Sequence, residues 1–476
     1  MELIPGATLK LTSMSTKSQS RPNLRTKSRK DKSKMEIKKL DFSRPFNANT
    51  IKIGLVILSL SAILAGLAAF FLSSGGSINT NITNFRASRA MSVDISDTAT
   101  MKSLASATEV FSRSLFKELA KETGGDNILV SPYSASLVLS MAASGAGGET
   151  QTEMMTGLRL PDMETVGSGW SQVIPALRSN ENFTLESANA AFTMENFDVL
   201  ATYRESLHNI FHSDISPVNF GEPQEATQTI NSWVSDMTNK KIEKLIEKDM
   251  VNGNTRLVLV NALYFKGDWE KQFDKKNTAQ DKFFLPSGEG VMADMMVQEA
   301  EIPYAVLDNI DSTIVELPYK GDRIVMQIVL PNEKSGLRGL EEKIGSVDIA
   351  DLFRQHQRDT KVRVKMPKFK LSSSADLSDP LKAMGMSNMF DATVADFSGI
   401  DGTRTLFVDF VKQEVAIEVN EEGSEAAAAT GMGMMMRSMP LPPEQFTVDH
   451  PFLFYIRDKL TGMLLFKGRI ANPTMS

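Results

Sequence analysis

A stretch of 18 residues near the C-terminal end constrains the possible fold more than any other part of the chain. It reads EEGSEAAAATGMGMMMRS, from Glu421 to Ser438, and lies between two segments with the apolar pattern of β-strands, 410–419 and 452–457. Four consecutive alanines favour a helix or a tightly packed strand over a solvated linker. A loop of this length inside a compact chain usually serves a function. We interpret the stretch as a segment that is displayed first and buried later.

The N-terminal part of the chain differs in charge from the rest. Residues 1–52 hold 13 Lys or Arg against 4 Asp or Glu, whereas residues 53–476 hold 39 against 54. Residues 53–72 carry no charge, and as a helix they would be about 30 Å long, enough to span a bilayer. Basic residues before this span predict an N-terminus in the cytoplasm and a body outside the cell, either secreted or membrane-anchored.

Two fates of the apolar span remain open. It is either a retained signal anchor or a signal peptide that is cleaved among the small residues 73–77. The basic head of residues 1–52 is long for a cleaved signal, and initiation at Met35 would shorten it. We expect residues 73–102 to form a flexible stalk rich in Ser, Thr and Asn, and residues 103–476 to form one large domain.

The composition of the body excludes several classes of function. An acidic body argues against nucleic acid as a partner. The chain has no cysteine, so disulfides, zinc–thiolate sites and thiol chemistry are excluded. Two sequons, at Asn81 and Asn182, predict N-glycosylation if the body is translocated.

The order of the patterns predicts an α+β fold with antiparallel sheets. One amphipathic helix is expected to begin near residue 103 and to stop at Gly124 and Gly125, and a second to begin at Pro132. Helical spacing also extends over 226–248. Strand-like runs follow at 256–265, 312–318, 323–331, 361–371 and 405–419, and a hairpin covers 452–470.

A search for catalytic or metal-binding residues gives little. His208 and His212 have the i, i+4 spacing that can share a metal ion, but no glutamate of an HExxH motif lies between them and no third ligand is evident. The chain contains no Gly-x-Ser-x-Gly elbow and no phosphate-binding glycine loop. We therefore expect no metal, no cofactor and no enzymatic activity.

Five segments match a known family in order. They are 127–134 (NILVSPYS), 259–269 (LVNALYFKGDW), 419–430 (VNEEGSEAAAAT), 450–456 (HPFLFYI) and 466–473 (FKGRIANP). On these residues the chain resembles a serpin from about residue 103 to its end. The resemblance implies three β-sheets, eight to nine helices, an exposed reactive-centre loop at about 421–443 and a monomer.

The resemblance also implies a mechanism. A serine protease attacks the loop, becomes acylated, and is carried along when the cut loop inserts into the main sheet as a new strand. The family hinge would cover Glu421 and 423–430, namely Gly423, Ser424, Glu425, Ala426, Ala427, Ala428, Ala429 and Thr430. Counting fourteen residues from Gly423 places the cut after Arg437, before Ser438. An arginine there predicts trypsin-like targets, whereas a cut after Met436 would redirect the inhibitor to chymotrypsin-like or elastase-like enzymes.

Further positions follow from the resemblance. Ser131, Ser134 and Asn261 match the polar cluster that controls opening of the main sheet, and Trp269 matches the tryptophan where insertion starts. Gln413 stands where the family usually has a histidine, so any pH dependence tied to that histidine would be absent. Residues 163–178 offer no basic side chain except Arg178, so we do not expect heparin binding. The alternative hypothesis is a non-inhibitory serpin that acts as a binding or carrier protein.

Overall fold

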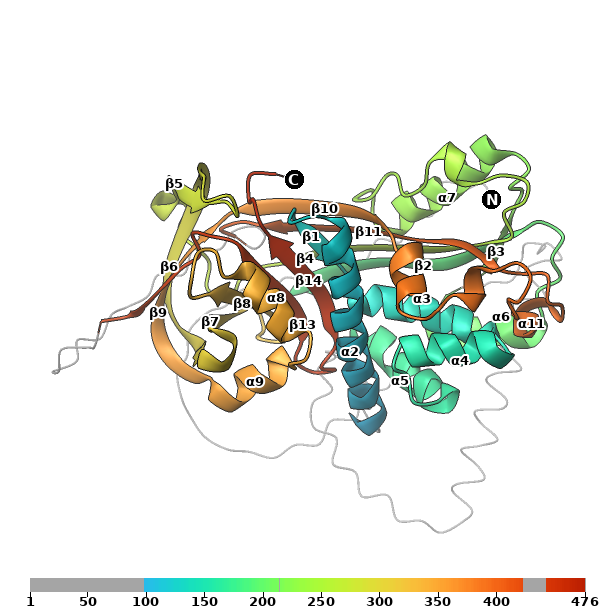
Figure 1. Cartoon of the computed structure of the whole chain (residues 1–476), viewed down its shortest axis with the longest axis horizontal. Helices are drawn as coiled ribbons and strands as arrows, with labels where there is room; N and C mark the ends of the chain where they lie inside the picture. Colours follow the sequence, from blue (N-terminus) through green and yellow to red (C-terminus); the bar gives the residue numbers. More distant parts are fainter. Residues whose placement is uncertain (1–97, 214, 423–441, 476) are drawn as a thin grey trace, which may run out of the picture. The chain divides into compact units, whose positions relative to one another are not determined.

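The predicted α+β class is confirmed by a computed structural model, which describes residues 98–213, 215–422 and 442–475. All of these residues belong to one compact unit, Ala90–Ser476. Helices dominate its first third and strands the remainder, as Figure 1 shows along the colour ramp. Among the described residues no helix has both the length and the apolar character needed to cross a membrane. The predicted span 53–72 lies outside the described residues.

A five-stranded sheet forms the first of two hydrogen-bonded sheets. Its strand order is β10, β11, β4, β2, β3. The strands cover Phe369–Asp376 (β10), Val408–Val419 (β11), Leu257–Gly267 (β4), Phe183–Met194 (β2) and Ile215–Val218 (β3). The central neighbours β4 and β11 run parallel, although each is antiparallel to its other neighbour.

The second sheet has nine strands. In order they are β1 (Ile128–Val130), β14 (Leu464–Ile470), β13 (Phe452–Asp458), β8 (Ile324–Pro331), β7 (Ser312–Pro318), β6 (Gly290–Leu307), β9 (Arg358–Pro367) and β12 (Glu444–Thr447), and β5 (Ala279–Phe284) also pairs with β6. Strand β6 pairs with β5 and β9 over most of its length and with β7 only at its end. This long strand joins the second and third of the three expected sheets into one.

The described helices are ten, slightly more than the eight to nine expected, because two short turns are counted among them. They are α2 (Thr98–Glu122), α3 (Pro132–Gly145), α4 (Gly148–Gly157), α5 (Met163–Ala176), α6 (Ala201–Phe211), α7 (Pro223–Met237), α8 (Leu337–Ile344), α9 (Ile349–His356), α10 (Ser378–Ala383) and α11 (Ser398–Asp401). Short 3₁₀ turns cover Lys248–Met250, Lys275–Asn277, Asp308–Ile310 and Asn388–Phe390.

Helix α7 ends earlier than the sequence pattern predicts. The apolar spacing continues through Ile242 and Leu245, and both side chains are buried, but the helix stops at Met237. Asn239 and Lys240 have φ values of 48° and 60°, in the left-handed region that a helix cannot contain. The buried residues beyond this point therefore belong to an irregular segment, and the prediction of helix up to 248 was wrong.

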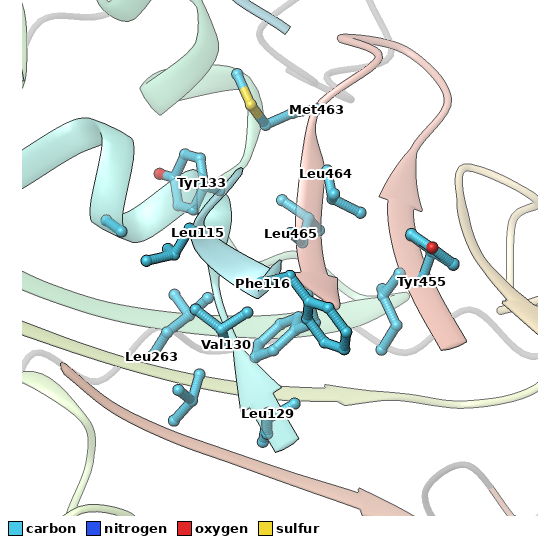
Figure 2. Packing of buried hydrophobic residues seen from close by; sticks show 14 of the residues in the cluster. Leu115, Phe116, Leu129, Val130, Tyr133, Leu263, Tyr455, Met463, Leu464 and Leu465 are labelled. Atoms are coloured by element: carbon cyan, nitrogen blue, oxygen red, sulfur yellow. The ribbon is translucent and has the colours of Figure 1, made fainter. Parts of the chain in front are cut away.

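Both faces of the five-stranded sheet are covered, which explains why β4 is almost wholly apolar. Val258, Val260 and Ala262 pack in a small cluster with α7, whereas Leu259 and Leu263 point into the main core. Figure 1 shows α7 on one side of this sheet and α3 on the other. Figure 2 shows part of the main core, with side chains from α2, α3 and β14. A residue at an odd position of β4 thus faces helix α3.

Candidate functional site

The parallel pair β4–β11 is the feature of the main sheet that the predicted insertion requires. Its register runs from Val408 opposite Leu257 to Ile417 opposite Phe265. The chain leaves β11 at Val419 and returns as β12 at Glu444, so residues 420–443 form the connection. A segment that turned back after β11 would run antiparallel to β11, and because β4 is parallel to β11, antiparallel to β4 as well. Such a segment can pair with both strands in the favourable antiparallel pattern.

Three polar side chains form a row across this sheet. Gln413 on β11 lies opposite Asn261 on β4, which lies opposite Asn189 on β2. Gln413 Nε2 donates to Asn261 Oδ1 over 2.6 Å, and Asn261 Nδ2 donates to Asn189 Oδ1 over 2.5 Å. Gln413 and Asn261 are fully buried. The bond between them is a side-chain link across the one gap that insertion would have to open.

The start of helix α3 holds this row from below. Ser131 is the N-cap of α3, and its hydroxyl accepts a hydrogen bond from the Ser134 backbone N–H over 3.1 Å. The Ser131 backbone N–H donates to Gln413 Oε1 over 2.9 Å, and Gln413 Nε2 donates to the Ser131 carbonyl over 3.1 Å. Ser134 Oγ accepts from Asn261 Nδ2 and donates to Asn189 Oδ1 over 2.8 Å. Pro132 suits the first turn because it lacks the N–H that would be unpaired there.

The structure therefore brings together four of the five residues of the expected sheet-opening cluster: Ser131, Ser134, Asn261 and Gln413. Both ends of the Gln413 amide are satisfied, so the glutamine fills a position at which a histidine is expected from the family. An amide does not titrate near neutral pH, so this bridge keeps its hydrogen bonds where an imidazole would change charge.

The fifth predicted residue, Trp269, lies farther along, just past the end of β4. Its indole stacks on Tyr319 with ring centroids 4.3 Å apart, and its Nε1–H donates to the Asn420 carbonyl over 2.9 Å. Gly267 permits this packing, since a Cβ there would lie 2.8 Å from the Tyr319 ring. Trp269 thus fixes the point at which the chain leaves β11.

Glu421 and Glu422, which follow Asn420, form contacts with several distant residues. Glu421 Oε1 accepts from Thr278 Oγ1 over 2.8 Å, and Glu421 Oε2 lies 3.2 Å from Lys368 Nζ. The Glu421 carbonyl accepts from the Phe273 N–H over 2.9 Å. Glu422 forms an ion pair with Lys275. The segment after β4, residues 268–278, therefore holds the first residues of the connection against the top of the sheet.

The environment of Glu421 shifts its acidity. Burial alone raises the pKa of this carboxyl, but the hydrogen bond from Thr278, a backbone hydrogen bond and the ion pair with Lys368 together hold the pKa below its usual value of 4.5. Glu421 is therefore ionised near neutral pH, and its charge contributes to holding the chain at this point.

The remaining residues of the expected hinge and of the expected cleavage site are not described by the structure. Gly423, Ser424, Glu425, the alanines 426–429, Thr430, Met436, Arg437 and Ser438 all lie outside the described residues. Their roles stay predictions from the sequence. Of the expected hinge, Glu421 alone is described.

Sequence reasoning missed several residues of this site. Asn189 completes the polar row, and Thr278, Lys368 and Lys275 hold the two glutamates. A signal for Asn189 exists, since it is a lone polar residue between Ala188 and Ala190 in an otherwise apolar run. The residues that hold Glu421 and Glu422 give no such signal, because they are separated from these glutamates by 53 to 147 positions along the chain.

Other predicted positions lie away from this site. His208 is in the last turn of α6 and His212 caps it with a φ of 47°; burial, then Arg178 and His208, lower the pKa of His212. Within the described part of the chain no three His, Cys, Asp or Glu side chains are grouped to hold a metal ion. Asn182 is half-buried and packs against Gly321, and Asn81 lies outside the described residues.

Comparison with a family model supports the geometry. Residues 106–473 match the model of the family described as serpin (serine protease inhibitor). The match includes both sheets, helix α3 and the connection that follows β11.

Individual relatives agree. The chain is 35% identical to the leukocyte elastase inhibitor of Bos taurus over 380 residues, covering 78% of this chain and all of the relative. It is 37% identical to the intracellular coagulation inhibitor 2 of Tachypleus tridentatus over 375 residues, covering 78% of this chain and 91% of the relative. Among solved structures, Serpin48, a highly specific serpin of the insect Tenebrio molitor, superposes with a TM-score of 0.70 at 35% identity, covering 78% and 98%.

These relatives overturn one prediction. An extracellular or membrane-anchored body was expected from residues 53–72, but a relative that is 37% identical over 91% of its own length is named an intracellular inhibitor. The predicted location was wrong, because charge and hydropathy of one apolar span cannot outweigh similarity over the whole folded body. The predicted N-glycosylation of Asn81 and Asn182 required translocation of the body, which this relative does not support.

The side-chain link between β11 and β4 can be tested with Gln413→Leu. The leucine keeps the volume but leaves Asn261 Oδ1 and the Ser131 backbone groups without their partner, at about 1–3 kcal/mol for each buried group left unpaired. We expect the urea midpoint to fall by an amount equivalent to about 2 kcal/mol or more. The control is Gln280→Leu, which removes a surface hydrogen bond to Asp294, and equal shifts in the two variants would contradict the role of Gln413.

The anchoring of Glu421 predicts a pH dependence. Because its folded-state pKa is below 4.5, its stabilising contribution is present near neutral pH and is lost as the pH falls through that lower value. The stability difference between the wild type and Glu421→Gln, measured by urea unfolding, should stay constant from about pH 7 to 5 and shrink below about pH 4.5. In the Lys368→Met background the pH-dependent part should decrease. A difference that persists unchanged at pH 3 would contradict the ion-pair account.

Proposed function

Because the chain belongs to the serpin family of serine protease inhibitors, we propose that it traps trypsin-like serine proteases by cleavage at Arg437–Ser438 and insertion of its loop between β4 and β11. The protease serine attacks the carbonyl carbon of Arg437. The peptide bond to Ser438 breaks, the amine of Ser438 leaves with a proton, and an ester joins Arg437 to the protease. The chain acts as a substrate that does not release its protease, and not as a catalyst.

The parallel pair β4–β11 is the observation that carries this proposal. Separating the two strands breaks one ladder, and a new strand between them forms two antiparallel ladders. The exchange therefore gains backbone hydrogen bonds, each worth about 1 kcal/mol net. A hairpin from the end of β11 reaches this gap without crossing another strand, since its first residues already lie beside Trp269.

The sequence of the connection suits the interior of a sheet. Side chains of a strand alternate between faces, and the set that alternates from Ser424 consists of Ser424, Ala426, Ala428, Thr430, Met432, Met434 and Met436. None of these is charged, so none carries the cost of burying an ion. The small residues come first, at the end where Trp269 and Glu421 mark the opening.

The length of the segment supports a large displacement of the protease. Fourteen residues from Ser424 to Arg437 at about 3.3 Å each extend over about 46 Å as a strand. An ester-linked protease would be carried this distance along the sheet. Distortion of its active site then prevents hydrolysis of the ester, and the native state with the loop outside would be held by a kinetic barrier.

The specificity rests on the sequence. Arg437 is the first charged residue after the chargeless run 426–436, and a carboxylate at the base of a trypsin-like specificity pocket would pair with it. The relatives named elastase inhibitors favour a second candidate. If the cut falls after Met436, the targets are elastase-like or chymotrypsin-like enzymes.

The experiment is to mix the protein with trypsin and to examine the products on a denaturing gel. We expect a complex that survives SDS, and its loss in Arg437→Ala without a change in the circular dichroism spectrum. Mass spectrometry of the released C-terminal fragment identifies the bond, since cleavage after Arg437 gives a fragment that begins at Ser438.

Other outcomes separate the alternatives. A complex with elastase but not with trypsin, and a fragment that begins at Arg437, would support cleavage after Met436. Simple cleavage by every protease, without a stable complex and without a gain in heat stability, would overturn the inhibitory proposal and favour a binding or carrier serpin.

A further inference from the structure

A pocket lies away from the main-sheet site, between helix α2, helix α8 and strand β14. Its volume is about 1010 Å³. In Figure 1, β14 is seen between α8 and α2. The pocket is lined by none of the residues that make up the polar row or that hold Glu421. The proposed protease trapping therefore gives it no role.

The charge of the pocket is opposite to that of the body. Among the described residues that line it, seven are basic and two are acidic, whereas residues 53–476 together carry more acidic than basic groups. Such a concentration of positive charge in a concave site attracts anions, because low-dielectric walls focus the field.

Most of these basic groups already have partners. Arg469 donates to the Asp126 carbonyl, Thr123 and Glu341, all within 2.9 Å. Lys334 pairs with Asp449, and Lys121 pairs with Glu118 at the rim. These contacts link α2, α8 and β14 and explain the presence of these residues by structure alone.

Lys467 on β14 is different. It is 1% exposed, and within the described part of the chain its ammonium forms no hydrogen bond and no ion pair. It lies over the faces of two aromatic rings, 4.6 Å from the centroid of Phe116 and 5.3 Å from that of Tyr455. Burial lowers the pKa of this ammonium to about 8. The nearby Glu109 carboxylate opposes the shift, as Glu341 does more weakly, whereas Arg457 and Arg113 add to it.

A second cation and a polar group nearby also lack partners. The Nε of Arg113 on α2 is buried without a hydrogen bond, and so is the hydroxyl of Tyr455. Arg113 lines the same pocket as Lys467. Buried donors without acceptors are rare in native proteins, and their clustering beside a cavity indicates that the missing acceptor belongs to a ligand.

The apolar residues that line the pocket indicate the chemistry of the rest of the ligand. Beside the two cations lie Phe116, Ala120, Leu337, Ile344, Pro286 and Pro451, which offer carbon surfaces from four separate segments. A pocket of this kind, apolar with a few convergent polar groups, suits a small organic molecule better than an inorganic ion.

We propose that this pocket binds a small amphipathic anion, whose carboxylate or sulfonate is held by Lys467 and Arg113 and whose apolar body packs against Phe116, Leu337 and Ile344. An anion supplies the acceptors that these cations lack, and charge-assisted hydrogen bonds are the stronger kind. A purely apolar ligand would leave Lys467 and Arg113 unpaired.

The test uses two probes with the same aromatic body. 8-Anilinonaphthalene-1-sulfonate carries a sulfonate, and N-phenyl-1-naphthylamine lacks it. Fluorescence titration and calorimetry of the full chain should give one site for the sulfonate, with an affinity about tenfold or more above that of the neutral amine.

Matched variants locate the site. Lys467→Met keeps the length of the side chain and removes the charge, and it should raise the Kd of the sulfonate about tenfold while changing that of the neutral amine less than about twofold. Lys121→Met makes the same change at the exposed rim and should change the sulfonate Kd less than about threefold. If Lys467→Met does not fold by circular dichroism, Arg113→Met carries the same comparison.

The outcomes decide the proposal independently of protease trapping. Equal binding of the two probes by the wild type would overturn it. Equal weakening of the sulfonate by Lys467→Met and Lys121→Met would also overturn it, since the effect would then be long-range attraction without a built site. Trapping of trypsin is measured separately, so its presence or absence does not affect this result.

Discussion

The ladder between β4 and β11 is the interaction on which the rest of the structure depends. It is a parallel pairing in the middle of the five-stranded sheet, so it can be replaced by two antiparallel ladders if a further strand arrives. The fold keeps the two strands together by more than backbone bonds. At the centre, Gln413 and Asn261 join across the gap, and the start of α3 holds both from the core side. At one end, Trp269 and Lys368 fix the chain as it leaves β11.

Under the proposed mechanism, the connection between β11 and β12 has two states. With the strands closed, the polar row is satisfied and Glu421 is paired. Insertion would break the link from Gln413 to Asn261 and draw the chain away from Trp269, and would gain a ladder on each side in return. If the proposed insertion occurs, the lifetime of the closed state depends on the rate at which these contacts open rather than on an equilibrium. The few contacts that hold Glu421 are therefore as important for keeping the sheet closed as the large hydrophobic core is for the fold.

Much of this fold follows from local sequence. The helix that starts at Pro132, the apolar run of β4 and the C-terminal hairpin are each specified by a few neighbouring residues, and each was predicted at nearly the right bounds. Helix α7 was predicted too long because burial of Ile242 and Leu245 imitates helical spacing after the backbone has turned at Asn239. The partners of Glu421 could not be predicted, since Thr278 and Lys368 meet it only through the register of distant strands. The location was wrong for another reason: an apolar span does not by itself decide a compartment.

The most direct test of the account is to lock the gap between β4 and β11. Ala416 lies opposite Tyr264 in this pair, neighbouring strands are about 4.8 Å apart, and a disulfide fits that spacing. Because the chain has no cysteine, the double variant Tyr264→Cys, Ala416→Cys would contain a single possible bridge. The measurement is the yield of SDS-stable complex with a protease that the reduced double variant traps. The account predicts that the oxidised form is cleaved without forming a complex and that reduction restores trapping. An oxidised form that traps the protease as well as the reduced form would contradict insertion between β4 and β11.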